Sequence, residues 1–184
     1  MNASHKKADI IWMNGEFMRW EEAQIHSISH GLHYGSAVFE GERAYEGQIF
    51  KSLEHSQRFH RSAEMLHMTL PYSPEALHEI KMEVLARNGL KDAYIRPIAW
   101  RGSEVLSVAS HQCSVHIAIA AWQWASYFAD VDVFKTGIKL AWADWTRPSP
   151  QTAPVAAKAA GLARRYGTRD NYADAQIISK FALT

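Results

Sequence analysis

The sequence has a single cysteine, Cys113, and almost no excess of either charge, with a formal net charge of +1. One cysteine cannot form an internal disulfide, which fits a reducing compartment, so we expect a cytoplasmic protein. Basic residues gather only in pairs, which is no footprint for nucleic acid. Apolar runs are too short to span a membrane, and the N-terminus lacks a signal-peptide core, so no membrane partner is expected.

Metal-binding patterns are also missing, although the chain has ten histidines. His55 and His60 lie five residues apart, which does not place them on one helical face, so we predict no metal site. What is present is an ordinary globular composition, with 47% hydrophobic and 21% charged residues. A chain of 184 residues is long enough for one domain and part of another.

Two hairpins are predicted near the N-terminus. Asn14-Gly15 separates strands at 10–13 and 16–20, and Glu46-Gly47 separates strands at 43–45 and 48–51. Asn-Gly between two such runs is the strongest short hairpin signal.

Two helices are predicted to follow. Ser52 is expected to cap a helix over about 53–68, and Ser73 to cap a second one with Pro74 in its first position. The second helix carries an apolar stripe and is predicted to end at Asn88-Gly89. Strands are predicted at 94–101, 114–124 and 138–142, with a connector at 126–136; the strand at 114–124 is expected to be central because nearly all its residues are apolar or small.

The order of these elements predicts an α+β protein with two parts, residues 1–130 and 131–184. The second part opens on a proline-rich stretch and then places Lys158 among small residues. Small neighbours let a planar group approach, and desolvation lowers the pKa of a lysine, which favours its nucleophilic amine. The alternative interpretation is a surface lysine on an alanine-rich helix.

Five strings in order carry a family resemblance: GLHYGSAVFEG at 31–41, EHSQRFHRS at 54–62, YIRP at 94–97, AAWQWASY at 120–127 and RPSPQTAPVAAKAAG at 147–161. Together they closely resemble the fold-type-IV (class IV) pyridoxal-phosphate aminotransferases of the branched-chain amino-acid type. The resemblance covers about residues 8 to 161. It implies a small domain with a mixed sheet and two helices, followed by an incomplete large domain.

The resemblance also implies a cofactor, pyridoxal 5'-phosphate, and residues that bind it. Lys158 corresponds to the lysine that forms a Schiff base with the cofactor and then moves a proton on the substrate. Arg58 corresponds to an arginine on the cofactor phosphate, for which a bidentate guanidinium is suited. Periodicity alone favours a plain helix-surface arginine at this position.

A third set of positions matches the substrate site of the family: Tyr34, Phe39, Gly41, Tyr94, Arg96, Trp124 and Tyr127. The aromatic residues would form a dry wall for an aliphatic side chain, and Gly41 would leave room for it. Arg96 and the tyrosine hydroxyls would hold the substrate carboxylate, since an arginine in an apolar strand is costly without an anionic partner. Taken singly, each aromatic residue fits ordinary core packing equally well.

The resemblance implies transfer of an amino group between leucine, isoleucine or valine and 2-oxoglutarate, in a homo-oligomer as in intact family members. The tail departs from the pattern: Ala163 stands where the family normally has a tyrosine, and the chain ends at Thr184, well before family members do. A truncated fragment without turnover is therefore one alternative. A D-amino-acid aminotransferase or an aminodeoxychorismate lyase, which share the lysine and the arginine, is another.

Overall fold

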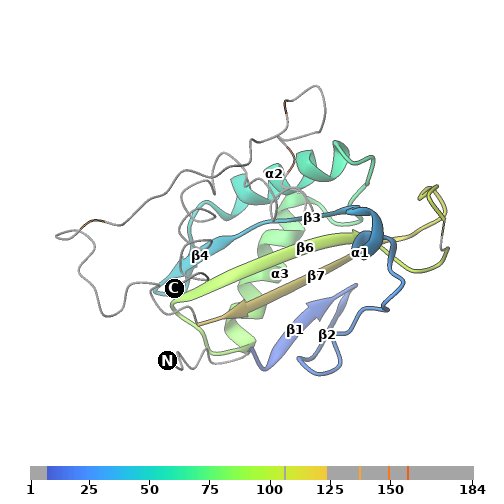
Figure 1. Cartoon of the computed structure of the whole chain (residues 1–184). Helices are drawn as coiled ribbons and strands as arrows, with labels where there is room; N and C mark the ends of the chain where they lie inside the picture. Colours follow the sequence, from blue (N-terminus) through green and yellow to red (C-terminus); the bar gives the residue numbers. More distant parts are fainter. Residues whose placement is uncertain (1–7, 106, 124–136, 138–148, 150–156, 158–184) are drawn as a thin grey trace.

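The structure is a computed structural model that describes residues 8–105, 107–123, 137, 149 and 157 (Figure 1). The predicted connector at 126–136, the strand at 138–142, Trp124, Tyr127 and Lys158 lie outside the described residues. The boundary expected near residue 130 also falls outside them, so the account below concerns the first part of the chain.

A seven-stranded sheet forms the centre of the fold, with the order β2-β1-β7-β6-β4-β5 and with β3 paired to β6. Its strands are β1 (Ile10–Met13), β2 (Glu16–Arg19), β3 (Ala37–Phe39), β4 (Glu42–Tyr45), β5 (Gln48–Ile49), β6 (Ala93–Arg101) and β7 (Val115–Trp122). Every strand pairing of the described residues is antiparallel. The α+β class is confirmed, but the mixed sheet is wrong for this part of the chain, because no crossover joins two parallel neighbours here.

Both predicted hairpins are confirmed. Asn14 and Gly15 have φ of 51° and 102°, and Glu46 and Gly47 have φ of 51° and 83°. Positive φ at both central residues is the turn whose twist matches the flanking strands. The second hairpin is shorter than predicted, because β5 ends at Ile49.

The helices are α1 (His30–Tyr34), α2 (Ser52–Glu64) and α3 (Pro74–Arg87), of which α1 was not predicted. The capping prediction for α3 is confirmed, since the Ser73 hydroxyl accepts a hydrogen bond from the Ala76 N–H at 3.1 Å. The one for α2 is wrong: Lys51, at a left-handed φ of 51°, is the N-cap and Ser52 already lies in the helix. This helix also ends four residues early, because His67 takes a positive φ of 54° that no helix can continue.

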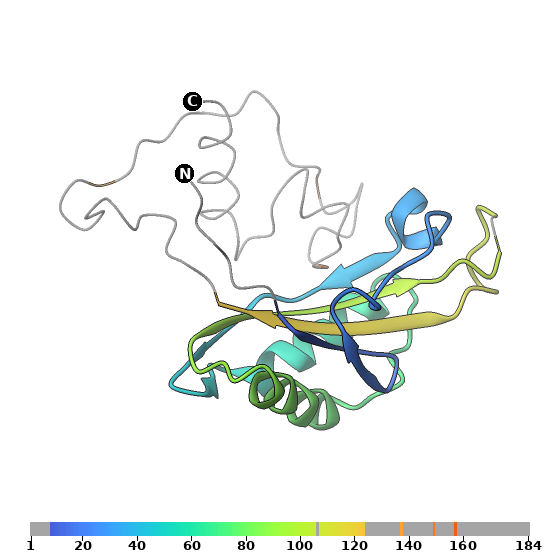
Figure 2. The ribbon, with the colours of Figure 1, turned by 90° about the horizontal axis from the view of Figure 1, so that it is seen from below.

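Helices α2 and α3 cover one face of the sheet (Figure 2). Alternate residues of the two central strands point into the resulting core: Ala93, Ile95 and Ala99 on β6, and Ile117, Ile119 and Ala121 on β7. Phe59, Ala63, Leu77 and Val84 of the helices close it from the other side. The period of two in a strand then sends Tyr94, Arg96 and Trp122 to the opposite, half-buried face.

None of the helices among the described residues is both long and apolar enough to cross a membrane.

Candidate functional site

The half-buried face of the sheet carries a cluster of three predicted substrate-site residues, in which two aromatic rings lie around one guanidinium. The Cζ atom of Arg96 lies 4.4 Å from the ring centroid of Phe39 and 5.2 Å from that of Tyr94. Its Nη2 donates a hydrogen bond to the Tyr94 hydroxyl at 2.9 Å. Strand pairing brings these side chains together, because β3 and β4 pair with successive segments of the same strand, β6.

One polar atom of this cluster has its hydrogen-bonding capacity unused. The Nε of Arg96 is buried and has no hydrogen-bond partner among the described residues. A buried donor without an acceptor is costly, and one on a charged guanidinium more so. The arrangement therefore suits a ligand that brings an acceptor to this point, such as a carboxylate.

Gly41 stands beside the cluster for a reason that differs from the prediction. A Cβ at this position would overlap the Tyr94 hydroxyl and lie 2.9 Å from its Cζ. The space expected for a substrate is therefore filled by the tyrosine. Glycine at position 41 lets the Tyr94 ring approach the backbone, where its hydroxyl meets Arg96.

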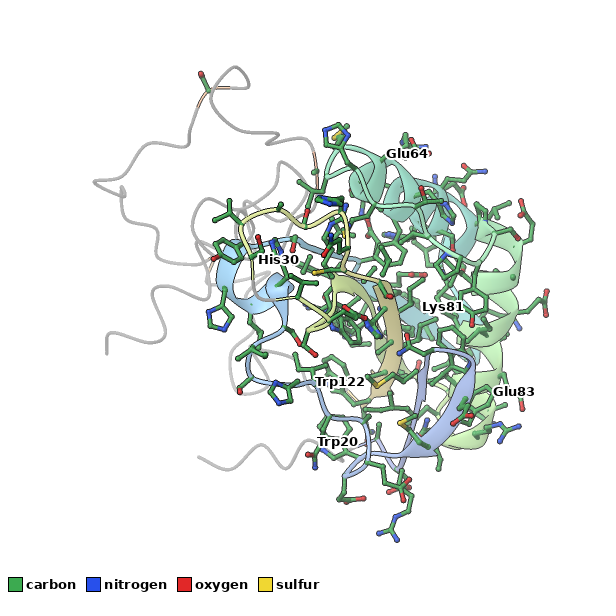
Figure 3. The ribbon with its side chains drawn as sticks, turned by 90° about the vertical axis from the view of Figure 1, so that its right-hand side faces the viewer. Trp20, His30, Glu64, Lys81, Glu83 and Trp122 are labelled. Atoms are coloured by element: carbon green, nitrogen blue, oxygen red, sulfur yellow. The ribbon has the colours of Figure 1, made fainter. Side chains whose placement is uncertain are left out.

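Trp122 is a further member that residue-by-residue reasoning missed. It is the cross-strand partner of Tyr94, and the two ring centroids lie 5.3 Å apart. Its label in Figure 3 marks the end of β7. The signal was available in the period of two along β7, which places Trp122 on the same face as its partner.

Tyr34, in contrast, lies away from this cluster at the end of α1. Its side chain is exposed, at 49%, and its ring lies tilted by 33° against that of the buried His30, with 4.5 Å between centroids. The described residues thus bring together Phe39, Gly41, Tyr94 and Arg96, and leave Tyr34 at another place.

Arg58 projects from α2 and forms a two-pronged ion pair with Glu40. Its Nε and Nη2 donate to the two carboxylate oxygens at 2.7 and 2.8 Å. The same carboxylate lies 2.9 Å from Nδ1 of His55. Glu40 was not predicted, although its place inside the string VFEG, one residue from Phe39 and Gly41, marks it as the residue pointing the other way from the sheet.

A pocket of about 190 Å³ opens beside this ion pair, lined by Lys51, Glu54, His55, Arg58 and Arg61. Two arginines and a lysine against one carboxylate give it a positive balance. All five residues belong to α2 or its cap, spaced so that they share one helical face. This donor set matches a phosphate dianion.

A second buried carboxylate belongs to Glu42, two positions after Glu40 in the sequence. The Nζ of Lys81 donates to both carboxylate oxygens of Glu42, at 3.0 and 2.8 Å, and to the Ser56 hydroxyl at 2.8 Å. Figure 3 shows Lys81 between the helices and the sheet. Desolvation by burial, which outweighs the attraction between the two charges, raises the pKa of Glu42 and lowers that of Lys81. Sequence reasoning missed the pair, yet Lys81 interrupts the apolar stripe of α3.

Comparison with known proteins gives the following matches. The family model described as amino-transferase class IV matches residues 37–176. The branched-chain-amino-acid aminotransferase of Escherichia coli (strain K12) is 38% identical over 183 residues, covering 91% of this chain and 59% of that protein. The probable branched-chain-amino-acid aminotransferase of Rickettsia bellii is 39% identical over 150 residues, covering 82% of this chain and 50% of that protein.

Solved structures agree. A branched-chain amino acid aminotransferase from the organism abbreviated T.th., solved with pyridoxamine 5'-phosphate, has a TM-score of 0.78 and 41% identity, covering 85% of this chain and 52% of that one. The Escherichia coli structure has a TM-score of 0.76 and 38% identity, covering 85% and 53%. The chain thus spans between half and three fifths of the length of these relatives.

Proposed function

Because the chain belongs to the class IV aminotransferases, we propose that it supplies one side of a branched-chain amino-acid aminotransferase site that uses pyridoxal 5'-phosphate. The reaction would move an amino group between leucine, isoleucine or valine and 2-oxoglutarate. Residues 1–130 would form the small domain and 131–184 the start of the large one, in a cytoplasmic homo-oligomer. The observation that carries the proposal is the unpartnered Arg96 Nε within an aromatic cluster of the described residues, in a chain with these relatives.

On the substrate side, the aromatic cluster supplies both required kinds of contact. Phe39 and Tyr94 give apolar ring surface, where each buried methylene of an aliphatic side chain contributes about 0.8 kcal/mol. Arg96 would hold the substrate carboxylate through its Nε, while its Nη2 stays on the Tyr94 hydroxyl. Trp124 and Tyr127 would extend the same wall; both lie outside the described residues.

On the cofactor side, the basic pocket on α2 fits a phosphate group by its donor set, and Arg58 is one of the residues that line it. Lys158, which lies outside the described residues, would bind the cofactor covalently and move the proton at the substrate Cα. When bound, pyridoxal 5'-phosphate supplies an electron-withdrawing ring that makes this proton removable. Arg58 would thus orient the cofactor and take no part in proton transfer.

Cofactor binding is tested by the visible absorbance of the purified chain after addition of pyridoxal 5'-phosphate. We expect a visible absorbance band that the chain alone lacks, and borohydride reduction should fix the label to the peptide that holds Lys158. Lys158→Ala is the control and should lose both signals. Labelling spread evenly over surface lysines in both proteins would contradict the proposal.

The substrate class is tested by offering leucine, D-alanine and aminodeoxychorismate as separate substrates. We expect the loaded chain to release 4-methyl-2-oxopentanoate from leucine and to leave the other two unchanged. Turnover of D-alanine or aminodeoxychorismate instead would assign the chain to another branch of the family. A chain that binds cofactor at Lys158 and converts none of the three would be a non-catalytic portion, which its coverage of 59% of the relative's length makes a specific alternative.

A further inference from the structure

We infer that Glu40 is a positioning residue that holds the guanidinium of Arg58 and the imidazole of His55 at the basic pocket, in the orientation that receives a phosphate group. The inference rests on the proposed function, because it takes that phosphate to belong to the cofactor. It adds a residue from the strand connection β3–β4 to a pocket whose own lining comes from α2 and its cap.

The geometry of the carboxylate supports this role. The Glu40 side chain is fully buried, while the Arg58 side chain is 31% exposed at the pocket. Two hydrogen bonds at 2.7 and 2.8 Å join one edge of the guanidinium to both carboxylate oxygens, so the plane of the guanidinium is fixed. A guanidinium has five N–H donors and can bond a carboxylate on one edge and a phosphate on another.

The sheet holds the carboxylate in turn. The Glu40 N–H donates to the Pro97 carbonyl at 2.9 Å, which ties the residue to β6 at the position next to Arg96. Glu40 points to the helices, whereas its neighbours Phe39 and Gly41 contact the cluster on the opposite face. One short segment therefore connects the substrate side with the phosphate side.

Glu40 also determines the tautomer of His55. A carboxylate only accepts hydrogen bonds, so the Nδ1 that lies 2.9 Å from Glu40 Oε2 carries a hydrogen. Arg58 Nη2, although 3.2 Å from the same Nδ1, then cannot donate to it and keeps its bond to Glu40. The oxygen Oε2 thus accepts from both groups and holds together two donors that would otherwise repel.

Charge and positioning predict opposite effects when Glu40 is neutralised. By charge alone, Glu40→Gln removes a negative charge next to the pocket and should strengthen phosphate binding. Loss of positioning frees the Arg58 side chain, which must then be ordered again when the phosphate binds, and should weaken binding. Glu54 gives the matched control, because it lines the same pocket, is exposed, and changes only the charge when replaced by glutamine.

The experiment compares the dissociation constants of pyridoxal and pyridoxal 5'-phosphate for the full chain, since their ratio isolates the phosphate. We expect Glu40→Gln to lower this ratio roughly tenfold, by analogy with the loss of affinity when residues that orient metal-binding side chains are removed. Glu54→Gln should not lower it. In an Arg58→Lys background, Glu40→Gln should have almost no further effect, because the residue that it positions is gone.

Each other result has a defined meaning. Phosphate preference that rises in Glu40→Gln, or falls equally in Glu54→Gln, overturns the positioning role and leaves the proposed function intact. A wild-type chain without phosphate preference overturns the proposed cofactor pocket and this inference with it. If Glu40→Gln does not fold, Glu40→Asp keeps the charge but withdraws the carboxylate by one methylene, and it should show the same loss; an unchanged ratio there counts against positioning.

Discussion

At the scale of single residues, the site depends on close approach between a backbone and an aromatic ring. Gly41 has no Cβ where the Tyr94 hydroxyl lies, and that hydroxyl accepts the Arg96 hydrogen bond at 2.9 Å. The three residues are therefore coupled: any side chain at position 41 moves the ring and breaks the bond to the arginine.

Gly41→Ala should shift Tyr94 and change the site more than the stability. The overlap falls on the far end of a side chain that can rotate, so we expect a loss of about 1 kcal/mol in the free energy of unfolding. Near-ultraviolet circular dichroism should change more clearly, because Tyr94 lies against Trp122. Tyr94→Phe in the Gly41→Ala background removes the hydroxyl and should recover part of the stability; strictly additive losses in urea unfolding would show that the two residues are independent.

At the scale of elements, the two serines that precede or begin helices have opposite roles. Ser73 caps α3 through the Ala76 N–H, whereas the Ser52 hydroxyl is buried in the first turn of α2 without a hydrogen-bond partner among the described residues. Both looked alike in the sequence, because each precedes an apolar stripe. The difference arises from the tight β4–β5 hairpin. The chain leaves it and enters α2 with the backbone of Lys51 in the left-handed conformation.

These roles predict a contrast between two identical substitutions. Ser73→Ala should lower the free energy of unfolding by about 1 kcal/mol, the usual effect of losing an N-cap. Ser52→Ala should be neutral or slightly stabilising, since it removes a buried polar atom that forms no hydrogen bond within the described part of the chain. Urea unfolding of both variants measures the difference directly. Equal losses in the free energy of unfolding would indicate that Ser52 also caps its helix.

At the scale of the whole molecule, one buried ion pair joins three elements. Lys81 comes from α3, Glu42 from β4 and Ser56 from α2, and the Lys81 side chain is only 1% exposed. Such pairs specify how layers meet but add little net stability, because desolvation offsets most of the attraction. Lys81→Met alone should therefore cost about 3–5 kcal/mol by leaving Glu42 buried and unpaired, whereas Glu42→Leu with Lys81→Met should be neutral or stabilising. Urea unfolding of the single and double variants measures both effects.

The pair also predicts how stability depends on pH. The pKa of Glu42 is raised above its ordinary 4.5, so the folded state binds more protons and stability falls as pH rises from 4.5 through the raised value. The pKa of Lys81 is lowered below 10.5, so the unfolded state binds more protons there, and stability recovers as pH rises from the lowered value towards 10.5. Urea unfolding across pH should show this dip in the wild type relative to Glu42→Leu/Lys81→Met; a constant difference would contradict it.

The sequence by itself determined part of the local structure and the family. Both hairpin turns, the cap and end of α3, and strands β6 and β7 follow from glycine, proline and apolar periodicity, because these act over a few residues. Ordered strings from 31 to 161 indicated the class IV aminotransferases, to which the chain belongs.

Only the tertiary structure decided which distant side chains meet. The antiparallel pairing of every described strand, the overlap of Gly41 with Tyr94, and the partners of Glu40 and Glu42 depend on how the helices pack on the sheet. A sequence pattern shows that a carboxylate stands in a strand. It does not show which arginine or lysine neutralises it, because that choice is made by burial across contacts between residues 18 and 39 positions apart in the sequence.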